Sequence, residues 1–376
     1  MSWSIRLFRV KGIDVKVHLT FVLILIWAAY RWGTSTGAGI QGALFGVVAT
    51  LLLFGAVTLH ELGHSLQALK YGVRVRDITL LPMGGLAQME EMPEKPKQEL
   101  AIALAGPLVN FAIAALLIGL GVLLQTQAVL TLPELYRSLG KANWAGLLAY
   151  LTSANLMLGL FNLIPAFPMD GGRVLRALLA MKLDYGKATA IAATIGQGLA
   201  LLLGLWGFTS GSYTLVLIAI FIWMGAGEEG KHVQVKDVLG EIRVGQAMTR
   251  APQTLKANDS LAKAVELTLS TSQAAFPVLE WGTNKVVGML GEADLLKGLQ
   301  TGGAPMPVRE AMRASFPVAT PSEPLALAVK HMAVGRTRAV PVIDATDQLV
   351  GLLTADDINE AYRLLLVSPK LAAQTG

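Results

Sequence analysis

The chain has 376 residues, of which 53% are hydrophobic and only 15% are charged, and its mean hydropathy is +0.53. Soluble globular domains carry about 25% charged residues, so this composition excludes an ordinary cytosolic enzyme. Lysine and arginine exceed aspartate and glutamate by 31 to 26, and in so apolar a chain we interpret this excess as a signal of membrane topology, with no nucleic-acid partner expected. The chain has no cysteine, which excludes disulfides and thiolate metal ligands.

Six apolar runs are long enough to be interpreted as membrane spans, which need about 20 residues each. The runs are 17–33, 42–67, 100–124, 144–167, 187–207 and 212–227. Only a few small polar residues separate the fifth run from the sixth, which predicts a tight helical hairpin. We therefore expect a polytopic α-helical membrane protein of about six spans, with its membrane domain over residues 1–230.

Basic residues gather on one side of these six spans. The N-terminal segment and the connections after the second and fourth spans carry most of them, whereas the other side has only Arg31, Arg137 and Lys141. Cytoplasmic segments are enriched in lysine and arginine. The distribution predicts a multi-pass protein of the cytoplasmic membrane, with both termini in the cytosol.

An internal repeat follows the last apolar run. The segment Phe276-Pro277-Val278-Leu279 is echoed about 64 residues later by Val340-Pro341-Val342-Ile343. Each copy has the pattern of a helix, short strands and a second helix, so two α/β units are expected to pack on one another. The sequence predicts a linker over 231–243, a soluble α/β pair over 244–364, and a tail over 365–376.

The second apolar run contains the sequence His60-Glu61-Leu62-Gly63-His64. Residues four apart share a helix face, so both imidazoles can bind one cation, and Glu61 can act as general base toward an attacking water. The alternative is that these polar residues only pack between helices. An acid at membrane depth costs about 2.5–3.5 kcal/mol, which favours a functional role.

A catalytic zinc ion takes three protein ligands and keeps one position open. Asp170 is an acid at the end of another apolar run, and the order of the spans places it at a depth similar to that of His64. Pro165 and Pro168 precede it and break the helix, which frees backbone groups that only a protein-lined cavity tolerates. We therefore predict a zinc site formed by His60, His64 and Asp170.

The HELGH motif and the segment Asn-Leu-Ile-Pro-Ala-Phe-Pro-Met-Asp-Gly-Gly, which begins at Asn162, together resemble the site-2 protease family of intramembrane zinc metalloproteases. The resemblance covers about residues 1–227 and implies one zinc ion per chain, bound by the same three residues. It also implies that Asn162 orients the substrate or the oxyanion. The loop containing Gly84 and Gly85 resembles a membrane-associated β-hairpin of the family, and we expect these glycines at its turn. The alternative for this loop is an ordinary connection.

The C-terminal repeat is similar to a tandem pair of CBS domains, a module that often binds adenine nucleotides. The ribose motif of that family, Gly-x-x-Thr/Ser-x-x-Asp, is complete in the second copy, where Thr354 and Asp357 match it. In the first copy Gly291 replaces the threonine and Asp294 remains, while Thr254 lies near the strand that contacts the base in the family. The resemblance implies ATP or AMP as the effector, and the alternative is a dimerisation module without a ligand.

The motifs together predict an intramembrane zinc endoprotease that cleaves membrane-spanning proteins and has a regulatory CBS pair, through which we expect a homodimer. An edge strand within 78–89 would hold the unwound substrate by strand addition. A CBS-gated transporter is one alternative, but it would need acids on several helices that line a path, and Glu61 and Asp170 are the only candidates that we find for such a path. A non-proteolytic membrane chaperone is the other, but it would lack a ligand or the base.

Overall fold

The computed structural model describes residues 3–89 and 93–367 of the chain. Contacts divide the chain into two compact units, Met1–Lys231 and His232–Gly376, and each is described by itself. The predicted linker, 231–243, is helical as far as Glu241, where helix α8 ends. Within the predicted tail, residues 368–376 lie outside the described residues.

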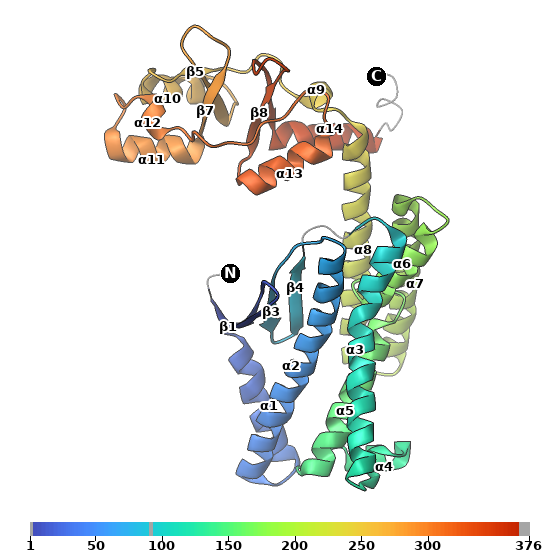
Figure 1. Ribbon diagram of the computed structural model, residues 1–376. Coiled ribbons are helices and arrows are strands. Elements are labelled where there is room, and N and C mark those ends of the chain that lie inside the picture. The colour runs from blue at the N-terminus through green and yellow to red at the C-terminus, as the bar shows by residue number, and fades with distance from the viewer. Residues whose placement is uncertain (1–2, 90–92, 368–376) are drawn as a thin grey trace. The chain divides into compact units, whose positions relative to one another are not determined.

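Long apolar helices dominate the N-terminal unit (Figure 1). Among the described residues, five are long and apolar enough to cross a membrane: α2 (Gly39–Lys70), α3 (Pro96–Leu123), α5 (Trp144–Asn162), α7 (Tyr185–Thr209) and the part Tyr213–Gly230 of α8 (Tyr213–Glu241). The shorter helices are α1 (Phe21–Ser35), η1 (Gln127–Val129), α4 (Leu132–Ser138) and α6 (Asp170–Ala180). The predicted polytopic α-helical class and the tight α7–α8 hairpin are confirmed.

Helix α1 differs from the span predicted at 17–33. Strand β2 (Ile13–His18) takes the first residues of that run, so α1 begins at Phe21 and has 15 residues. At 1.5 Å per residue it is about 22 Å long, shorter than a hydrocarbon core of roughly 30 Å. It packs along α2, where Phe21 and Phe54 meet edge to face with their ring centroids 4.7 Å apart.

A four-stranded sheet lies beside α2, in the order β1–β2–β3–β4 (Figure 1). Its strands are β1 (Ser4–Val10), β2 (Ile13–His18), β3 (Val75–Leu81) and β4 (Gly84–Met89). The two outer pairs are antiparallel, whereas β2 and β3 run parallel with the buried residues Val15 and Ile78 in register. An ion pair of 2.7 Å between Lys16 Nζ and Asp77 Oδ2 joins the same two strands. The sheet therefore links the N-terminus to the segment after α2 and leaves β4 at an edge.

The β3–β4 hairpin confirms the predicted strand–turn–strand but corrects the position of its turn. Leu81 pairs with Gly84, so the turn is Pro82-Met83 and both glycines belong to β4. The φ of Gly84 is +138°, which favours glycine. A Cβ at Gly85 would lie 2.7 Å from Cγ of Glu61. The backbone of β4 therefore runs directly against the residue predicted as the base.

A helix break separates α5 from α6, as Pro165 and Pro168 predicted. The intervening chain turns back so tightly that a Cβ at Gly171 would lie 2.2 Å from the carbonyl oxygen of Ile164. Glycine at position 171 allows this close approach. The turn of the chain places Asp170 at the first position of α6.

A buried ion-pair cluster connects α3, α6 and α8 at Arg176, whose side chain is 2% exposed. Its Nε donates to Oε1 of Glu99 at 2.8 Å, and its Nη1 lies 2.5 Å from Oε1 of Glu229. The guanidinium also lies over the rings of Phe167 and Tyr185, at 5.0 and 4.9 Å from their centroids. One arginine therefore neutralises acids from two neighbouring helices.

The C-terminal unit contains two similar α/β halves, as the repeat predicted. The first half has α10 (Leu261–Ser270), β6 (Ala275–Leu279), β7 (Val286–Gly291) and α11 (Glu292–Gly302), and the second has α13 (Leu325–Gly335), β8 (Ala339–Ile343), β9 (Leu349–Thr354) and α14 (Ala355–Val367). The short elements are α9 (Val244–Ala247), β5 (Leu255–Lys256) and α12 (Val308–Ala311). Strand β5 adds to the β6–β7 pair, and β8 pairs with β9.

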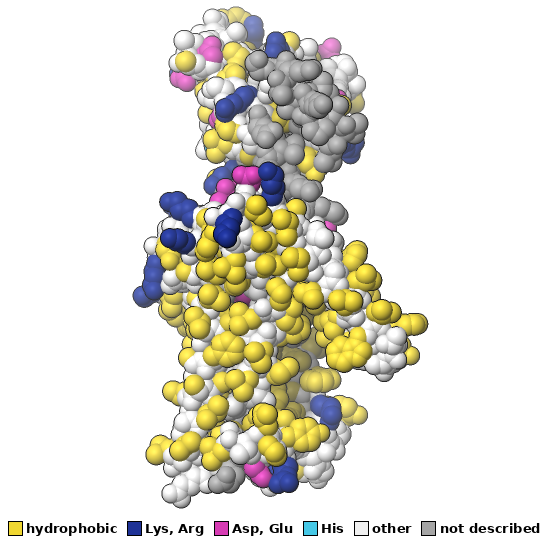
Figure 2. Space-filling model, turned by 90° about the vertical axis from the view of Figure 1, so that its right-hand side faces the viewer, with side chains coloured by type: hydrophobic (Ala, Val, Ile, Leu, Met, Phe, Trp, Pro, Cys, Tyr) yellow, Lys and Arg dark blue, Asp and Glu magenta, His cyan; other side chains and the backbone are white. Residues whose placement is uncertain are grey.

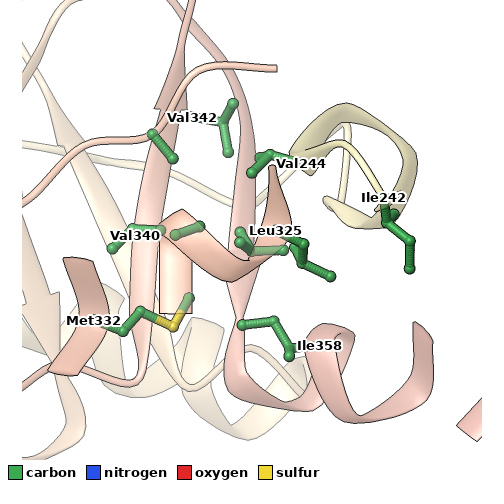
Figure 3. Packing of buried hydrophobic residues seen from close by; sticks show 10 residues of the cluster. Ile242, Val244, Leu325, Met332, Val340, Val342 and Ile358 are labelled. Carbon is green, nitrogen blue, oxygen red and sulfur yellow. The ribbon is translucent and has the colours of Figure 1, made fainter. Parts of the chain in front are cut away.

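The core of the second half is built from apolar side chains of α13, α14, β8, β9 and the segment around α9 (Figure 3). Val244, Leu325 and Val340 are fully buried there. The segment before the first half therefore packs into the second half, which makes the pair one folded unit.

We predict that Arg176→Met lowers the thermal unfolding midpoint of the full-length chain in detergent, because it leaves Glu99 buried without a counter-charge. Removing one partner of a buried ion pair costs about 3–5 kcal/mol. The control is Lys187→Met, whose ion pair with Asp184 is exposed and should contribute about 0–1 kcal/mol. Equal midpoints for the two variants would show that the cluster does not stabilise the fold.

Candidate metal centre and active site

Helix α2 presents His60 and His64 on one face, as their four-residue spacing predicted. The two residues are 7% and 3% exposed, and their Nε2 atoms lie 3.1 Å apart. Both are thus withdrawn from solvent with one nitrogen of each ring directed at the same point.

Asp170 completes this group from the first position of α6. Its Oδ2 lies 3.1 Å from Nε2 of His64 and 3.4 Å from Nε2 of His60. Among residues 3–89 and 93–367, these three side chains form the one group of histidines and acids whose ligand atoms lie close enough together to bind one metal ion. The structure therefore brings together the three residues proposed as ligands from the sequence.

The protons on the two imidazoles are set by partners on α3. His64 Nδ1 donates to the carbonyl oxygen of Ile102 at 2.7 Å, and His60 Nδ1 lies 2.5 Å from Oδ1 of Asn110. A carbonyl oxygen only accepts, so each Nδ1 carries the hydrogen and each Nε2 has a free lone pair. The Nε2 lone pairs of the two histidines and the Asp170 carboxylate then converge with no hydrogen between them. A cation bound at this point would interact favourably with all three.

The distances fit zinc. Zinc binds nitrogen and carboxylate oxygen at about 2.0–2.2 Å in a tetrahedron, which separates the ligand atoms by roughly 3.3 Å. The three separations here are 3.1, 3.1 and 3.4 Å. Three protein ligands also leave the open position that a catalytic site needs.

Helix α3 packs against the group through Gly106. A Cβ at this position would lie 2.2 Å from Nε2 of His64. The backbone of α3 therefore forms one wall of the site, and a side chain here would displace the imidazole.

A cavity of about 580 Å³ opens beside the three residues, and residues of α2, α3, β4, α5, α6 and α8 line it. Its lining includes the residues proposed as base and for substrate positioning, Glu61, Asn162, Gly84 and Gly85. Arg173 is the cationic side chain among the described lining residues, and from the sequence it counted only as a topology charge. Its spacing of three from Asp170 is the sequence signal that could have predicted both side chains at one site. Asn110 also lines the cavity, and the sequence alone assigned it no role at the site.

The predicted nucleotide-binding residues lie in the C-terminal unit, where Asp294 and Asp357 occupy equivalent positions of the two halves. Asp357 Oδ2 accepts hydrogen bonds from the backbone N and Oγ1 of Thr354, at 2.8 and 2.7 Å, where α14 begins. Asp294 instead forms an ion pair of 2.8 Å with Arg313. Thr254 directly precedes β5. The two aspartates therefore have different partners.

Fold and site together define a polytopic membrane protein with a buried His-His-Asp group and a C-terminal α/β pair. Residues 48–203 match the model of peptidase family M50, and residues 240–301 and 308–364 each match the CBS domain. A zinc metalloprotease of Methanocaldococcus jannaschii is 37% identical over 372 residues, which cover 99% of each chain. The Rip3 protein of Mycobacterium tuberculosis is 30% identical over 399 residues, covering 98% of this chain and 96% of its own. A solved site-2 protease from M. jannaschii is 43% identical, covers 61% of this chain and 95% of its own, and has a TM-score of 0.42.

The chain belongs to peptidase family M50, the site-2 protease family, and carries a tandem CBS pair. It is a multi-pass membrane protein and a zinc metalloprotease, which confirms the class of enzyme predicted from the sequence. The transporter and chaperone alternatives are not favoured.

We predict that Gly106→Ala weakens zinc retention by tenfold or more, because the added methyl group displaces His64. Disturbing the support of a ligand histidine costs about 10–100-fold in metal affinity. Gly119→Ala on the same helix is the control, since a Cβ there meets nothing within 4 Å. Zinc per chain, measured by elemental analysis after dialysis against a chelator, should fall only in the first variant. Equal zinc in both would mean that α3 does not constrain the site.

Proposed function

We propose that His60, His64 and Asp170 bind the catalytic zinc ion and that Glu61 is the general base. The observation that carries this proposal is the triangle of ligand atoms, 3.1–3.4 Å apart, in the same cavity as Glu61. Bound zinc supplies Lewis acidity toward the scissile carbonyl. Glu61 takes a proton from the attacking water and returns it to the nitrogen of the leaving amine.

Two further side chains of the cavity suit the negative charge that develops on the carbonyl oxygen. Asn162 can donate a hydrogen bond from its amide, and Arg173 brings a positive charge near both Glu61 and Asp170. Donors aimed at a developing oxyanion supply much of the rate in acyl-transfer reactions. We assign Asn162 to this task together with substrate orientation.

The substrate class that we propose is a protein that spans the membrane, cleaved within or beside its span. A helix has its backbone hydrogen bonds satisfied, so the scissile segment must unwind before cleavage. Strand β4 is an edge of the sheet and lines the cavity through Gly84 and Gly85, and the second glycine lies against Glu61. An unwound segment can pair with this edge by strand addition, which holds its peptide bonds beside the base.

We predict that Glu61→Gln retains zinc but lowers the rate of proteolysis by orders of magnitude, because the amide cannot accept a proton. Asn162→Ala should lose less, at most about 3–4 kcal/mol of transition-state stabilisation for one donor. The measurement is cleavage of a co-expressed membrane peptide, with Glu134→Gln on the exposed part of α4 as the control. Cleavage by Glu61→Gln at the wild-type rate would contradict the mechanism.

We also propose the cytoplasmic membrane as the location, with both termini and the CBS pair in the cytosol. The support is the distribution of lysine and arginine in the sequence, which favours one side of the spans. On the face of the N-terminal unit seen in Figure 2, hydrophobic side chains cover the middle, and Lys and Arg gather mainly toward one end. This is the pattern of a protein that crosses a bilayer with one more basic side.

For the CBS pair we propose regulation by an adenine nucleotide, ATP or AMP, bound in the second half through Thr354 and Asp357. A cavity of about 420 Å³ is lined by Ala355 and Ile358, which adjoin these two residues in the chain. Arg336 and Arg338 also line it, and their charge suits an anion. In the first half Asp294 is already paired with Arg313. The equivalent neighbour in the second half is the neutral Thr249, whose Oγ1 is 3.5 Å from Asp357.

We predict that Asp357→Asn weakens nucleotide binding about ten- to a hundredfold, because a charge-assisted bond to ribose contributes about 1.5–3 kcal/mol. The substitution retains an oxygen that can cap α14, so folding should be preserved. Asp294→Asn is the matched control at the equivalent position and should change affinity little. Titration calorimetry with ATP and AMP on the full-length protein in detergent measures both. Absence of heat with the wild type, or equal losses in both variants, would contradict the assignment.

A homodimer formed through the CBS pair is also proposed. Helices α10, α11 and α13 expose large apolar side chains, Leu269, Leu296 and Val334, at 83, 54 and 80%. If these side chains form one contiguous apolar patch, that patch would suit contact with a second copy.

A further inference from the structure

Two buried asparagines extend the hydrogen bond that His60 makes. Asn110 on α3 is fully buried, and Asn155 on α5 is 1% exposed. Nδ2 of Asn110 donates to Oδ1 of Asn155 at 2.9 Å, and Nδ2 of Asn155 donates to the carbonyl oxygen of Leu151 at 2.8 Å. With the 2.5 Å contact between His60 and Asn110, these bonds form a continuous relay from α5 through α3 to α2.

The last acceptor sets the direction of every bond in this relay. The carbonyl of Leu151 cannot donate, so Asn155 must turn its amino group toward it and its oxygen toward Asn110. Asn110 then donates to Asn155 and presents its own oxygen to His60, whose Nδ1 must carry the hydrogen. The lone pair on Nε2 of His60 is thereby left facing Oδ2 of Asp170 at 3.4 Å.

We propose that Asn110 and Asn155 are positioning residues for zinc, which hold His60 in the tautomer and ring orientation that the metal requires. This inference rests on the metal site proposed above. Histidines that bind metals usually donate their second N–H to such a partner, and losing the partner costs about 10–100-fold in metal affinity. The support of His64 comes from the backbone carbonyl of Ile102, which substitution does not remove. The side-chain relay is therefore the part of this support that mutation can test.

The competing interpretation is that the two asparagines only join α3 to α5. Interhelical hydrogen bonds between such residues do stabilise membrane helices. A packing role predicts a loss of thermal stability without a specific loss of metal affinity. A positioning role predicts that metal affinity follows the acceptor offered to His60, whatever happens to stability.

The test measures the dissociation constant of Zn²⁺ by chelator competition, on the full-length protein in detergent. Asn110→Leu removes the acceptor and should weaken binding about 10–100-fold. Asn110→Asp keeps an acceptor for His60 but cannot donate to Asn155, and it should bind zinc at least as tightly as wild type. Asn155→Leu should weaken binding by less than Asn110→Leu, and adding it to Asn110→Leu should cause no further loss.

Thr152→Val is the matched control, because Thr152 is a polar residue on α5 that is 1% exposed and its Oγ1 has no hydrogen-bond partner. It should leave zinc affinity unchanged. Wild-type affinity in Asn110→Leu, or a loss in Asn110→Asp as large as in Asn110→Leu, would overturn the relay. If Asn110→Leu does not fold, Asn110→Asp and Asn155→Leu still test the proposal. We expect zinc affinity to fall in Asn155→Leu and not in Asn110→Asp, so the reverse result would overturn it.

A further variant separates this inference from the proposed metal site. His60→Ala should lose most of the zinc whether or not the relay matters. Zinc that is lost in His60→Ala but retained in Asn110→Leu overturns only the relay, whereas zinc retained in His60→Ala overturns the metal site itself.

Discussion

Three hydrogen-bond acceptors converge inside the N-terminal unit, and the arrangement of the surrounding helices depends on satisfying them. Nε2 of His60, Nε2 of His64 and Oδ2 of Asp170 lie within 3.4 Å of one another, and each Nδ1 hydrogen is already engaged elsewhere. Buried polar groups without partners are costly. A cation at this point satisfies all three, so metal binding and helix packing are coupled. On the proposed assignment, the site therefore contributes to the packing of these helices as well as to the chemistry.

Helix α6 is held at two points, one in the convergent group and one in the buried ion-pair cluster. Asp170 at its start belongs to the convergent group, and Arg176 in its middle binds Glu99 of α3 and Glu229 of α8. The helix has only 11 residues, so a shift of one point moves the other. The buried ion pairs therefore do more than offset their own desolvation, because they fix the register in which α6 presents its carboxylate to α2.

The sequence predicted the parts of this site that depend on local spacing. The interval between His60 and His64 is a helical repeat, and an acid at an apolar end identified Asp170. The β1–β2 hairpin and its parallel pairing with β3 were not predicted, because the end of β2 overlaps the start of a run interpreted as a span and its partner strand follows a 32-residue helix. The roles of Asn110 and Arg313 were not predicted either, since each depends on a partner brought close only by the fold. The turn was predicted at Gly84-Gly85 from their residue type, whereas the strand register places it two residues earlier, at Pro82-Met83.

The same register places the glycines of β4 inside the strand, where they allow its backbone to pack against Glu61. A side chain at Gly85 would occupy the space of the Glu61 side chain, so the edge strand must have a bare backbone at the point where it meets the base. A strand that offers mainly backbone groups recognises a partner by its conformation, through main-chain hydrogen bonds. Unwinding a substrate helix in an apolar setting breaks those same bonds, and the proposed pairing with β4 would replace them. If substrates bind in the proposed way, selection at this edge depends on how readily a span unwinds, and the identity of its side chains matters only where they meet the cavity wall.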